Sequence, residues 1–219
     1  MPANQPSENP VNIALASVDE GATPKHRQIL QGARQIFLRD GFDGASMSAI
    51  TQAAGVSKST IYSHFHSKAL LFEALIREER RVQMQQVFNS DAFTGDLHED
   101  LLQLATGIIH VILSPTALAH LRIVIAIATK FPNIGAAFFE AGPGAGRERL
   151  SALLASLHAR GDLNITEPAM AANHFIGLCR SDLLMHALLT PNLEISAAYI
   201  EQTARSGVDV FLRAYRRGP

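Results

Sequence analysis

The chain has 219 residues, of which 47% are hydrophobic and 18% are charged, and its formal net charge is −1. This composition is typical of a folded globular protein and excludes an intrinsically disordered chain. No uncharged apolar run reaches about 18 residues, so we expect no transmembrane helix. Cys179 is the single cysteine, so we expect no intramolecular disulfide and a reducing, cytoplasmic setting.

The N-terminal segment, residues 1–22, is rich in Pro, Asn, Ser and Glu, which predicts a mobile tail. It lacks the positive start and the long apolar stretch of a signal peptide. Charge is unevenly distributed beyond it: residues 24–90 carry nine Lys and Arg against five Asp and Glu, a net charge of +4. A positive excess confined to one small segment is typical of a nucleic-acid-binding module, although a solvated charged face would give the same count.

From Pro24 onward apolar residues recur at helical spacing, and runs of β-branched residues flanked by turns are missing. We therefore predict an all-α fold. The first helix is expected to begin at Pro24 behind an N-cap at Thr23 and to end at Gly41. Two short helices are expected at 47–54 and 58–65, joined by Gly55 and Val56, and a long helix is expected from residue 68 to about residue 88.

The remaining residues contain further helical segments, with Gly and Pro between them. A segment over 133–159 is interrupted by the sequence GPGAG, and Thr190, Pro191 and Asn192 separate the last two helices. The expected helices cover residues 97–113, 117–130, 133–159, 167–189 and 193–216. The whole chain is thus predicted to form about nine helices, in a small N-terminal three-helix unit and a larger C-terminal helical bundle.

The stretch from Ser46 to Leu75 has the layout of a helix-turn-helix, in which two short helices are joined by a turn that contains glycine. The residues expected to face inward are Ile50, Ala53, Val56, Ile61 and Phe65. The outward face of the second helix is then short, polar and rich in hydrogen-bond donors: Lys58, Ser59, Thr60, Tyr62, Ser63 and His64. Such a face suits contact with base edges in a DNA groove, whereas the alternative is an ordinary solvated helix with serine N-caps.

This stretch resembles the signature of the TetR family of repressors over about 50 residues. The matching features, in order, are Gly41–Phe42, Ser46–Ala54, Gly55–Val56–Ser57, Thr60–Ile61–Tyr62, Phe65, Ser67–Lys68 and Leu70–Leu71–Phe72. The resemblance implies a helix-turn-helix DNA-binding domain over 23–66 and a ligand-binding and dimerisation domain over 67–219. It also implies a homodimer formed through the last two helices, an inverted-repeat operator in double-stranded DNA, and a small-molecule effector that releases the repressor.

The DNA contacts are expected on and beside the second short helix. The candidates for contact with the groove are Lys58, Ser59, Thr60 and Ser63, next to the N-cap Ser57. The resemblance assigns phosphate contacts to Tyr62 and His64. Ser46 and Lys68 lie at helix starts, where a phosphate can bind free backbone N–H groups. Because Ser59 and Ser63 are small, recognition of DNA shape is expected to matter beside direct hydrogen bonds to bases.

A ligand pocket is expected where polar residues interrupt apolar helices, because burial of a polar group without a partner costs about 1–3 kcal/mol. The polar candidates are His110, Arg122, Arg180 and Asp182, and the candidates for apolar walls are Phe138, Phe139 and Phe175. The apolar content of the bundle favours a hydrophobic or aromatic ligand. Each of these residues could instead be an ordinary, satisfied residue of the core.

No catalytic site is expected, because a nucleophile elbow, a P-loop, a dinucleotide-binding glycine motif and an HExxH motif are missing. The nine histidines form no cluster with Cys or carboxylates, so neither a metal nor another cofactor is expected. Two alternatives to a ligand-responsive repressor stay open: a DNA-binding regulator without a ligand, and a helical adaptor that does not bind DNA. An apolar cavity with a few inward polar groups would favour the ligand-responsive repressor over the first alternative.

Overall fold

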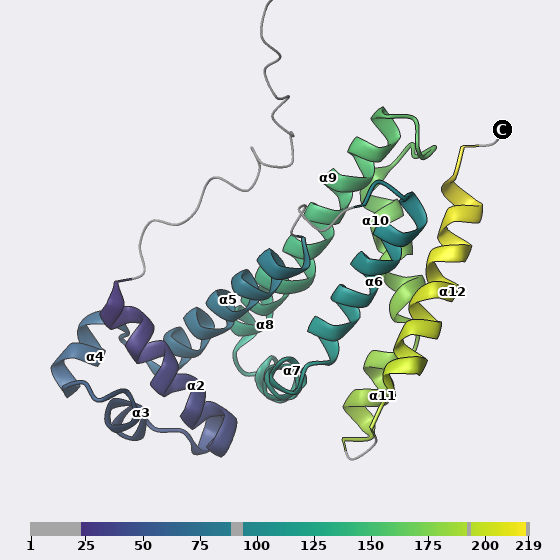
Figure 1. Cartoon of the computed structure of the whole chain (residues 1–219). Helices are drawn as coiled ribbons and strands as arrows, with labels where there is room; N and C mark the ends of the chain where they lie inside the picture. The colour runs from purple at the N-terminus through teal and green to yellow at the C-terminus, as the bar shows by residue number, and fades with distance from the viewer. Residues whose placement is uncertain (1–22, 89–93, 192–193, 218–219) are drawn as a thin grey trace, which may run out of the picture.

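The computed structural model describes residues 23–88, 94–191 and 194–217, and Figure 1 shows them as a set of packed helices. Within these residues no strand occurs, and an isolated antiparallel bridge joins Leu163 to Arg216. The predicted all-α fold is confirmed. The tail predicted over 1–22 lies outside the described residues.

Neither a membrane-spanning helix nor a metal cluster is found in the described part of the chain. Each helix taken alone is too short or too polar to cross a membrane. Two consecutive helices, Leu97–Leu113 and Pro115–Ile127, reach the necessary length and apolar composition together, but they meet at a bend of 57°. Among the same residues, no group of three His, Cys, Asp or Glu side chains could hold a metal ion.

Three helices form the N-terminal unit, here named the head: α2 (Pro24–Gly44), α3 (Met47–Ala54) and α4 (Lys58–His64). Each begins behind the residue that the sequence indicates, because a side-chain oxygen accepts one of the first free backbone N–H groups. Thr23, Ser46 and Ser57 supply these oxygens for α2, α3 and α4. The end of α2 differs from the prediction: Gly41 has φ 70° and kinks the helix, which continues to Gly44.

A glycine lets α2 and α3 cross at close range. A Cβ atom on Gly32 would lie 2.5 Å from the backbone N of Ala54, so a larger side chain would force the two helices apart. Across the same contact, Gln28 Nε2 donates to Ala54 O at 2.7 Å. The prediction that Ala53 faces inward is wrong: Ala53 is exposed, because Ala54 occupies the crossing point.

A long helix, α5 (Lys68–Val87), leads from the head into the body, a name used here for the helices from α6 to α12 (Figure 1). The first helices of the body are α6 (Leu97–Leu113), α7 (Pro115–Ile127), α8 (Pro132–Phe139) and α9 (Ala145–Ala159). The GPGAG sequence does not interrupt the helical path as expected, since a π-helical turn, η2 (Glu140–Gly144), joins α8 directly to α9. The wider π turn accommodates Pro143, which has no N–H to donate.

The last helices are α10 (Pro168–Arg180), α11 (Leu183–Leu189) and α12 (Ala197–Tyr215). The prediction of one helix over 167–189 is wrong, because Ser181 has φ 47° and ψ −131° and separates α10 from α11. The last helix also begins later than residue 193, which itself lies outside the described residues: Ser196 caps α12 by accepting from Tyr199 N at 3.2 Å. Hydrophobic periodicity indicates which face of a segment is apolar, but it does not show where the backbone leaves the helix.

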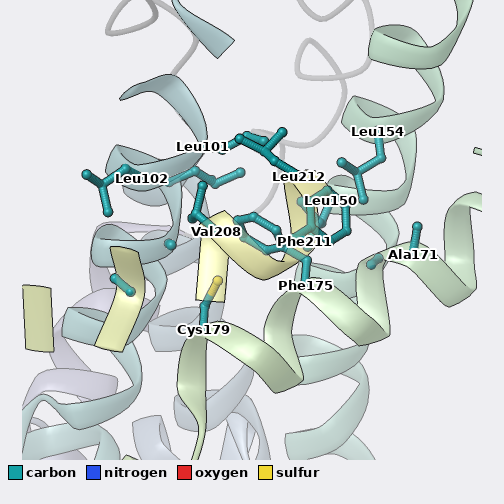
Figure 2. Packing of buried hydrophobic residues seen from close by; sticks show 14 of the residues in the cluster. Leu101, Leu102, Leu150, Leu154, Ala171, Phe175, Cys179, Val208, Phe211 and Leu212 are labelled. Atoms are coloured by element: carbon teal, nitrogen blue, oxygen red, sulfur yellow. The ribbon is translucent and has the colours of Figure 1, made fainter. Parts of the chain in front are cut away.

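The contact between α10 and α12 forms the centre of the main core (Figure 2). Phe175 and Phe211 are fully buried and meet edge to face, with ring centroids 5.1 Å apart. A Cβ atom on Gly207 would lie 2.7 Å from the backbone N of Cys179, so these two helices also approach closely. Burial raises the pKa of the Cys179 thiol to about 12, so Cys179 stays protonated and packs as a small apolar residue.

A second core joins the head to the body. Phe72 of α5 contacts Phe37 and Phe42 of the head edge to face, with centroids 4.8 Å and 5.5 Å apart. From the body, Phe131 packs on Phe42 at 5.2 Å. Further residues of α7 and α8 belong to the same cluster: Val124, Ile127, Ile134 and Phe138. The domain boundary between residues 66 and 67 stays a prediction, and apolar packing is continuous across it.

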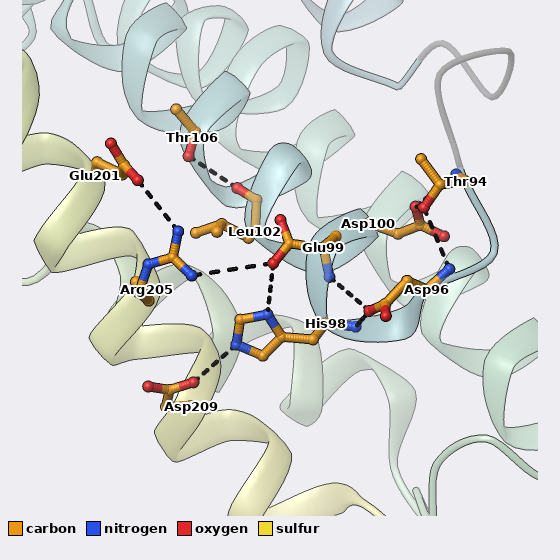
Figure 3. Close-up of polar contacts among 10 residues, drawn as sticks. All are labelled: Thr94, Asp96, His98, Glu99, Asp100, Leu102, Thr106, Glu201, Arg205 and Asp209. Carbon is orange, nitrogen blue, oxygen red and sulfur yellow. Dashed lines mark hydrogen bonds and ion pairs between the residues drawn. The ribbon is translucent and has the colours of Figure 1, made fainter.

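Polar contacts tie the start of α6 to α12 (Figure 3). His98 Nε2 lies 2.9 Å from Asp209 Oδ1, and Glu99 Oε1 lies 3.4 Å from His98 Nδ1 and 4.0 Å from Arg205 Nη1. The hydrogen bond to Asp209, followed by the one to Glu99, raises the pKa of His98. The protonated form of His98 therefore strengthens the contact between α6 and α12.

We expect Gly207→Ala to destabilise the protein by about 1–3 kcal/mol, because the added methyl group meets backbone atoms of Cys179 rather than a movable side chain. Gly107→Ala in α6 is the matched control. A Cβ atom there meets nothing within 4 Å among the described residues, so this variant should be more stable, by about 0.5–1 kcal/mol. Urea unfolding measures both changes, and equal stability of the two variants would contradict the close crossing of α10 and α12.

We expect His98→Gln to reduce stability more in acid than in base. The pKa of His98 is raised in the folded chain, so its contribution is fully present below the unfolded pKa of about 6.5 and is lost as the pH rises through the folded pKa. The difference in thermal midpoint between the unsubstituted chain and the variant should be larger at about pH 5.5 than at about pH 8.5. Asp209→Asn should show the same dependence, and a difference that is constant with pH would refute the assignment.

Candidate functional site

Helix α4 presents a polar outer face on the head. Ile61 is fully buried and Phe65 nearly so, and these two side chains hold the inner side of the helix against α2 and α3. Thr60 is half-buried. The exposed residues are Lys58, Ser59, Tyr62, Ser63 and His64. The structure therefore brings the predicted outward residues together on one short helix.

The hydroxyl groups of α4 form a local chain of hydrogen bonds. Ser57 Oγ accepts from Thr60 N at 3.1 Å and lies 2.8 Å from Ser59 Oγ and 2.7 Å from Thr60 Oγ1. Ser63 Oγ donates to Thr60 O at 2.8 Å. Because a hydroxyl can donate once and accept twice, Ser59 and Ser63 keep free acceptor positions, and their orientation is set before a partner binds.

Lys68 links the end of α2 to the start of α5. Its Nζ donates to Ala45 O at 2.8 Å and to Asp43 O at 3.3 Å, and it lies 4.7 Å from the centroid of the Phe42 ring. Two of the three ammonium hydrogens are therefore used inside the head, and the predicted phosphate contact would use the third. Ser46 is exposed beside this contact, with its Oγ accepting from Ala49 N at 3.1 Å.

The structure contains a cavity of about 130 Å³ lined by residues of α5, α6, α7, α8, η2, α9, α10 and α11. Its wall is predominantly apolar and includes Ile108, Val111, Leu121, Phe138 and Ile176. The charged side chains in its lining are Arg80 from α5 and Arg180 from α10. An apolar cavity with a few polar groups is the usual form of a small-molecule site.

Arg80 enters this cavity from α5 and is only 6% exposed. Its Nη1 donates to Gln83 Oε1 at 2.9 Å and its Nη2 to Ala117 O at 3.5 Å, while its Cζ lies 4.5 Å from the centroid of the Phe138 ring. Gly142 leaves room for the side chain, since a Cβ atom there would lie 3.1 Å from Arg80 Cδ. Burial lowers the pKa of Arg80, although an arginine remains charged in proteins.

The residue before Arg80 connects α5 to the head and to α7. Glu79 Oε1 lies 3.1 Å from Arg34 Nε on α2, and Glu79 Oε2 lies 2.9 Å from Nδ1 of the buried His120 on α7. Arg34 Nη2 also donates to Thr116 Oγ1 on α7 at 3.4 Å. Glu79 and Arg80 therefore reach α7 at neighbouring positions, one from the side of the head and one from the side of the cavity.

Comparison with known proteins gives two family matches. Residues 29–75 match the bacterial regulatory proteins of the tetR family, and residues 99–217 match the C-terminal domain of AefR-like transcriptional repressors. A solved structure of a TetR-family transcriptional regulator from Mesorhizobium loti MAFF303099 is 30% identical, with a TM-score of 0.78 over 88% of this chain and 97% of that one. The chain belongs to the TetR family.

Other relatives agree with this membership of the TetR family. The structure of the Flavonoid-responsive Regulator FrrA is 33% identical, with a TM-score of 0.76 over 89% of this chain and 98% of that one. The HTH-type transcriptional repressor Rv1474c of Mycobacterium tuberculosis is 38% identical over 77 residues, which are 35% of this chain and 41% of that protein. The HTH-type transcriptional regulator UidR of Escherichia coli K12 is 42% identical over 59 residues, 27% and 30% of the two chains. This chain thus matches less than half the length of these two curated relatives.

The family and its members are transcriptional regulators, not enzymes.

The residues predicted for the pocket of this TetR-family chain lie in separate places. Phe138 and Arg180 line the cavity that contains Arg80. His110 and Arg122 line a second cavity of about 520 Å³, where Arg122 Nη2 donates to Ala187 O at 2.7 Å and so caps α11. The other three lie outside the lining of both cavities: Phe139 is 53% exposed, Phe175 is in the core, and Asp182 is exposed between α10 and α11.

Sequence reasoning missed Arg80, which lines the cavity, and Glu79, which contacts α2 and α7. They belong to the run REERR over 77–81, and such a run is usually a solvated helix face. The sequence did contain an indication of their burial, namely their spacing from apolar residues earlier on α5. Glu79 follows the buried Leu75 by four residues and Arg80 follows the buried Ile76 by four, so both lie on the apolar side of the helix.

Proposed function

We propose that this TetR-family protein is a homodimeric repressor that binds an inverted-repeat operator through α4 and is released from it by a small molecule in the cavity beside Arg80. The observation that carries the DNA-binding part is the outer face of α4. Its side chains are exposed, polar and held by local hydrogen bonds, while Ile61 fixes the inner side. A helix presented in this way can enter the major groove of DNA.

The outer surface of α10, α11 and α12 supports a homodimer. Large apolar side chains are exposed along these helices: Met170, Leu178, Met185, Leu189, Tyr199 and Val210. Leu189 reaches 73% exposure. Figure 1 places α12 at the edge of the body farthest from the head. A second copy covering this surface would remove the apolar side chains from water and leave both heads free to contact half-sites spaced by about one DNA turn, roughly 34–36 Å, or somewhat more.

The cavity supports an effector with an apolar body, and its presence favours a ligand-responsive repressor over a regulator without a ligand. One relative of similar fold, FrrA, is described as flavonoid-responsive, which fits an aromatic effector here. The effector would act through α7, because Arg80 contacts Ala117 O from the cavity while Arg34 and Glu79 contact the same helix from the head side. A shift of α7 would then change the angle of the head and the spacing of two α4 helices.

Selection from random duplex DNA should recover an inverted repeat whose affinity falls steeply with salt. Lys58→Ala is then expected to weaken binding to that operator by about 1–3 kcal/mol, through loss of a contact from the exposed end of α4. Arg160→Ala, which removes an exposed positive charge from the body, is the control and should bind as the unsubstituted chain does. Recovery of no enriched sequence at low salt would favour the adaptor without DNA binding.

Glu79→Gln is expected to weaken operator binding by about 0.5–2 kcal/mol, because the head loses the contact that orients Arg34 and α2. Glu73→Gln is the matched control on the same helix, since Glu73 pairs with Arg77 of α5 itself. Fluorescence anisotropy with the selected operator measures both variants, after thermal unfolding has verified that they are folded. If the two variants bind alike, the contact between Glu79 and Arg34 does not orient the head.

A further inference from the structure

The cavity beside Arg80 is lined by two positively charged side chains and by no negatively charged one. Its lining contains the guanidinium groups of Arg80 and Arg180, and the lining residues include no Asp or Glu. The remaining wall is apolar, with Ile108, Leu121 and Phe138 among its members. Burial of a charge in such surroundings is costly unless an opposite charge or a set of hydrogen bonds accompanies it.

The contacts of Arg80 within the described residues are all with neutral groups. They are the amide of Gln83, the carbonyl of Ala117 at the long distance of 3.5 Å, and the ring of Phe138. Its Nε is buried and lacks a hydrogen-bond partner there. The charge of the neighbouring Glu79 raises the pKa of Arg80 against the larger effect of burial, but the Glu79 carboxylate oxygens contact Arg34 at 3.1 Å and His120 at 2.9 Å rather than Arg80.

Arg180 of α10 is half-buried and brings the second positive charge to the cavity wall. It is the last residue of α10, and its Nε is buried without a hydrogen-bond partner among the described residues. The positive φ of Ser181 ends α10 at this point, so that Leu184 of α11 joins Arg180 in the cavity wall.

We infer that the effector is an organic anion, with a carboxylate paired to Arg80 and Arg180 and an apolar body of about one ring in the rest of the cavity. This inference rests on the proposed function of the cavity as the effector site. A planar guanidinium group can bind a carboxylate through two parallel hydrogen bonds. The Nε atom of each of the two arginines is a buried donor without a partner among the described residues, and it can donate to the carboxylate. The volume of about 130 Å³ is close to that of apolar cavities that hold benzene, about 150 Å³.

The test compares acids with their uncharged amides on the full chain. Benzoate and phenylacetate, each at constant ionic strength, are titrated beside benzamide and phenylacetamide, with inorganic phosphate as a further anion. Calorimetry should give carboxylate affinities about 10-fold or more above those of the amides, and phosphate should not bind. Equal binding of acid and amide, binding of phosphate alone, or failure of both acids to bind would each overturn the inference.

Substitution of single arginines tests which residues bind the carboxylate. Arg80→Met and Arg180→Met should each weaken benzoate binding about 10-fold or more, whereas Arg77→Met, which removes an exposed arginine one turn earlier on α5, should not. Methionine can occupy an arginine site in an apolar wall, and Arg180→Met provides the test if Arg80→Met does not fold. Unchanged affinity in the folded variants would overturn the assignment.

Adding the selected operator separates this inference from the proposed function. Release of DNA by benzoate and not by benzamide supports both. If benzoate binds in the cavity but leaves the operator bound, the anion site stands and the repressor mechanism fails. If the amides bind and release the operator as well as the acids do, the repressor mechanism stands and the anionic effector is overturned.

Discussion

Helix α5 places a half-buried negative charge, Glu79, and a buried positive charge, Arg80, on consecutive residues, and this pair connects α5 to the helices around it. Successive residues of an α-helix point about 100° apart, so Glu79 and Arg80 cannot serve the same partner. Glu79 turns toward Arg34 and His120, while Arg80 turns into the cavity and over the Phe138 ring. The partners that these two side chains have outside α5 come from α2, α7 and α8, while Arg80 Nε stays without a hydrogen-bond partner among the described residues.

The π-helical turn η2 lies against the side chain of Arg80. Arg80 passes so close to Gly142 that a side chain there would crowd it, and the turn brings Pro143 into the cavity wall as well. π-helical turns inside α-helices are frequent at functional sites, because they re-aim the backbone without ending the helix. The glycine-rich sequence that resembles a simple break is therefore part of the enclosure of a buried arginine.

Much of the head follows from local chemistry, and the sequence could predict it for that reason. Thr23, Ser46 and Ser57 cap their helices through oxygens that lie three residues before the amide they accept. The polar face of α4 is likewise a consequence of the spacing between Ile61 and Phe65. By contrast, the inward position of Ala54 rather than Ala53 depends on the crossing of α2 at Gly32, which is a contact between distant segments.

The all-α class, the helix-turn-helix and its outward residues could be predicted from local sequence, because capping and periodicity act over a few residues. Which polar residues of the body share a cavity depends instead on how the helices pack. Phe138 and Arg180 line the same cavity as Arg80, whereas His110 and Arg122 line another cavity, and Phe175 belongs to the core. The reason is geometric: α6, α7 and α8 are apolar over much of their surface, so the side that faces a cavity is set by the neighbouring helices and by the backbone break at Ser181, and not by the residues of each helix alone.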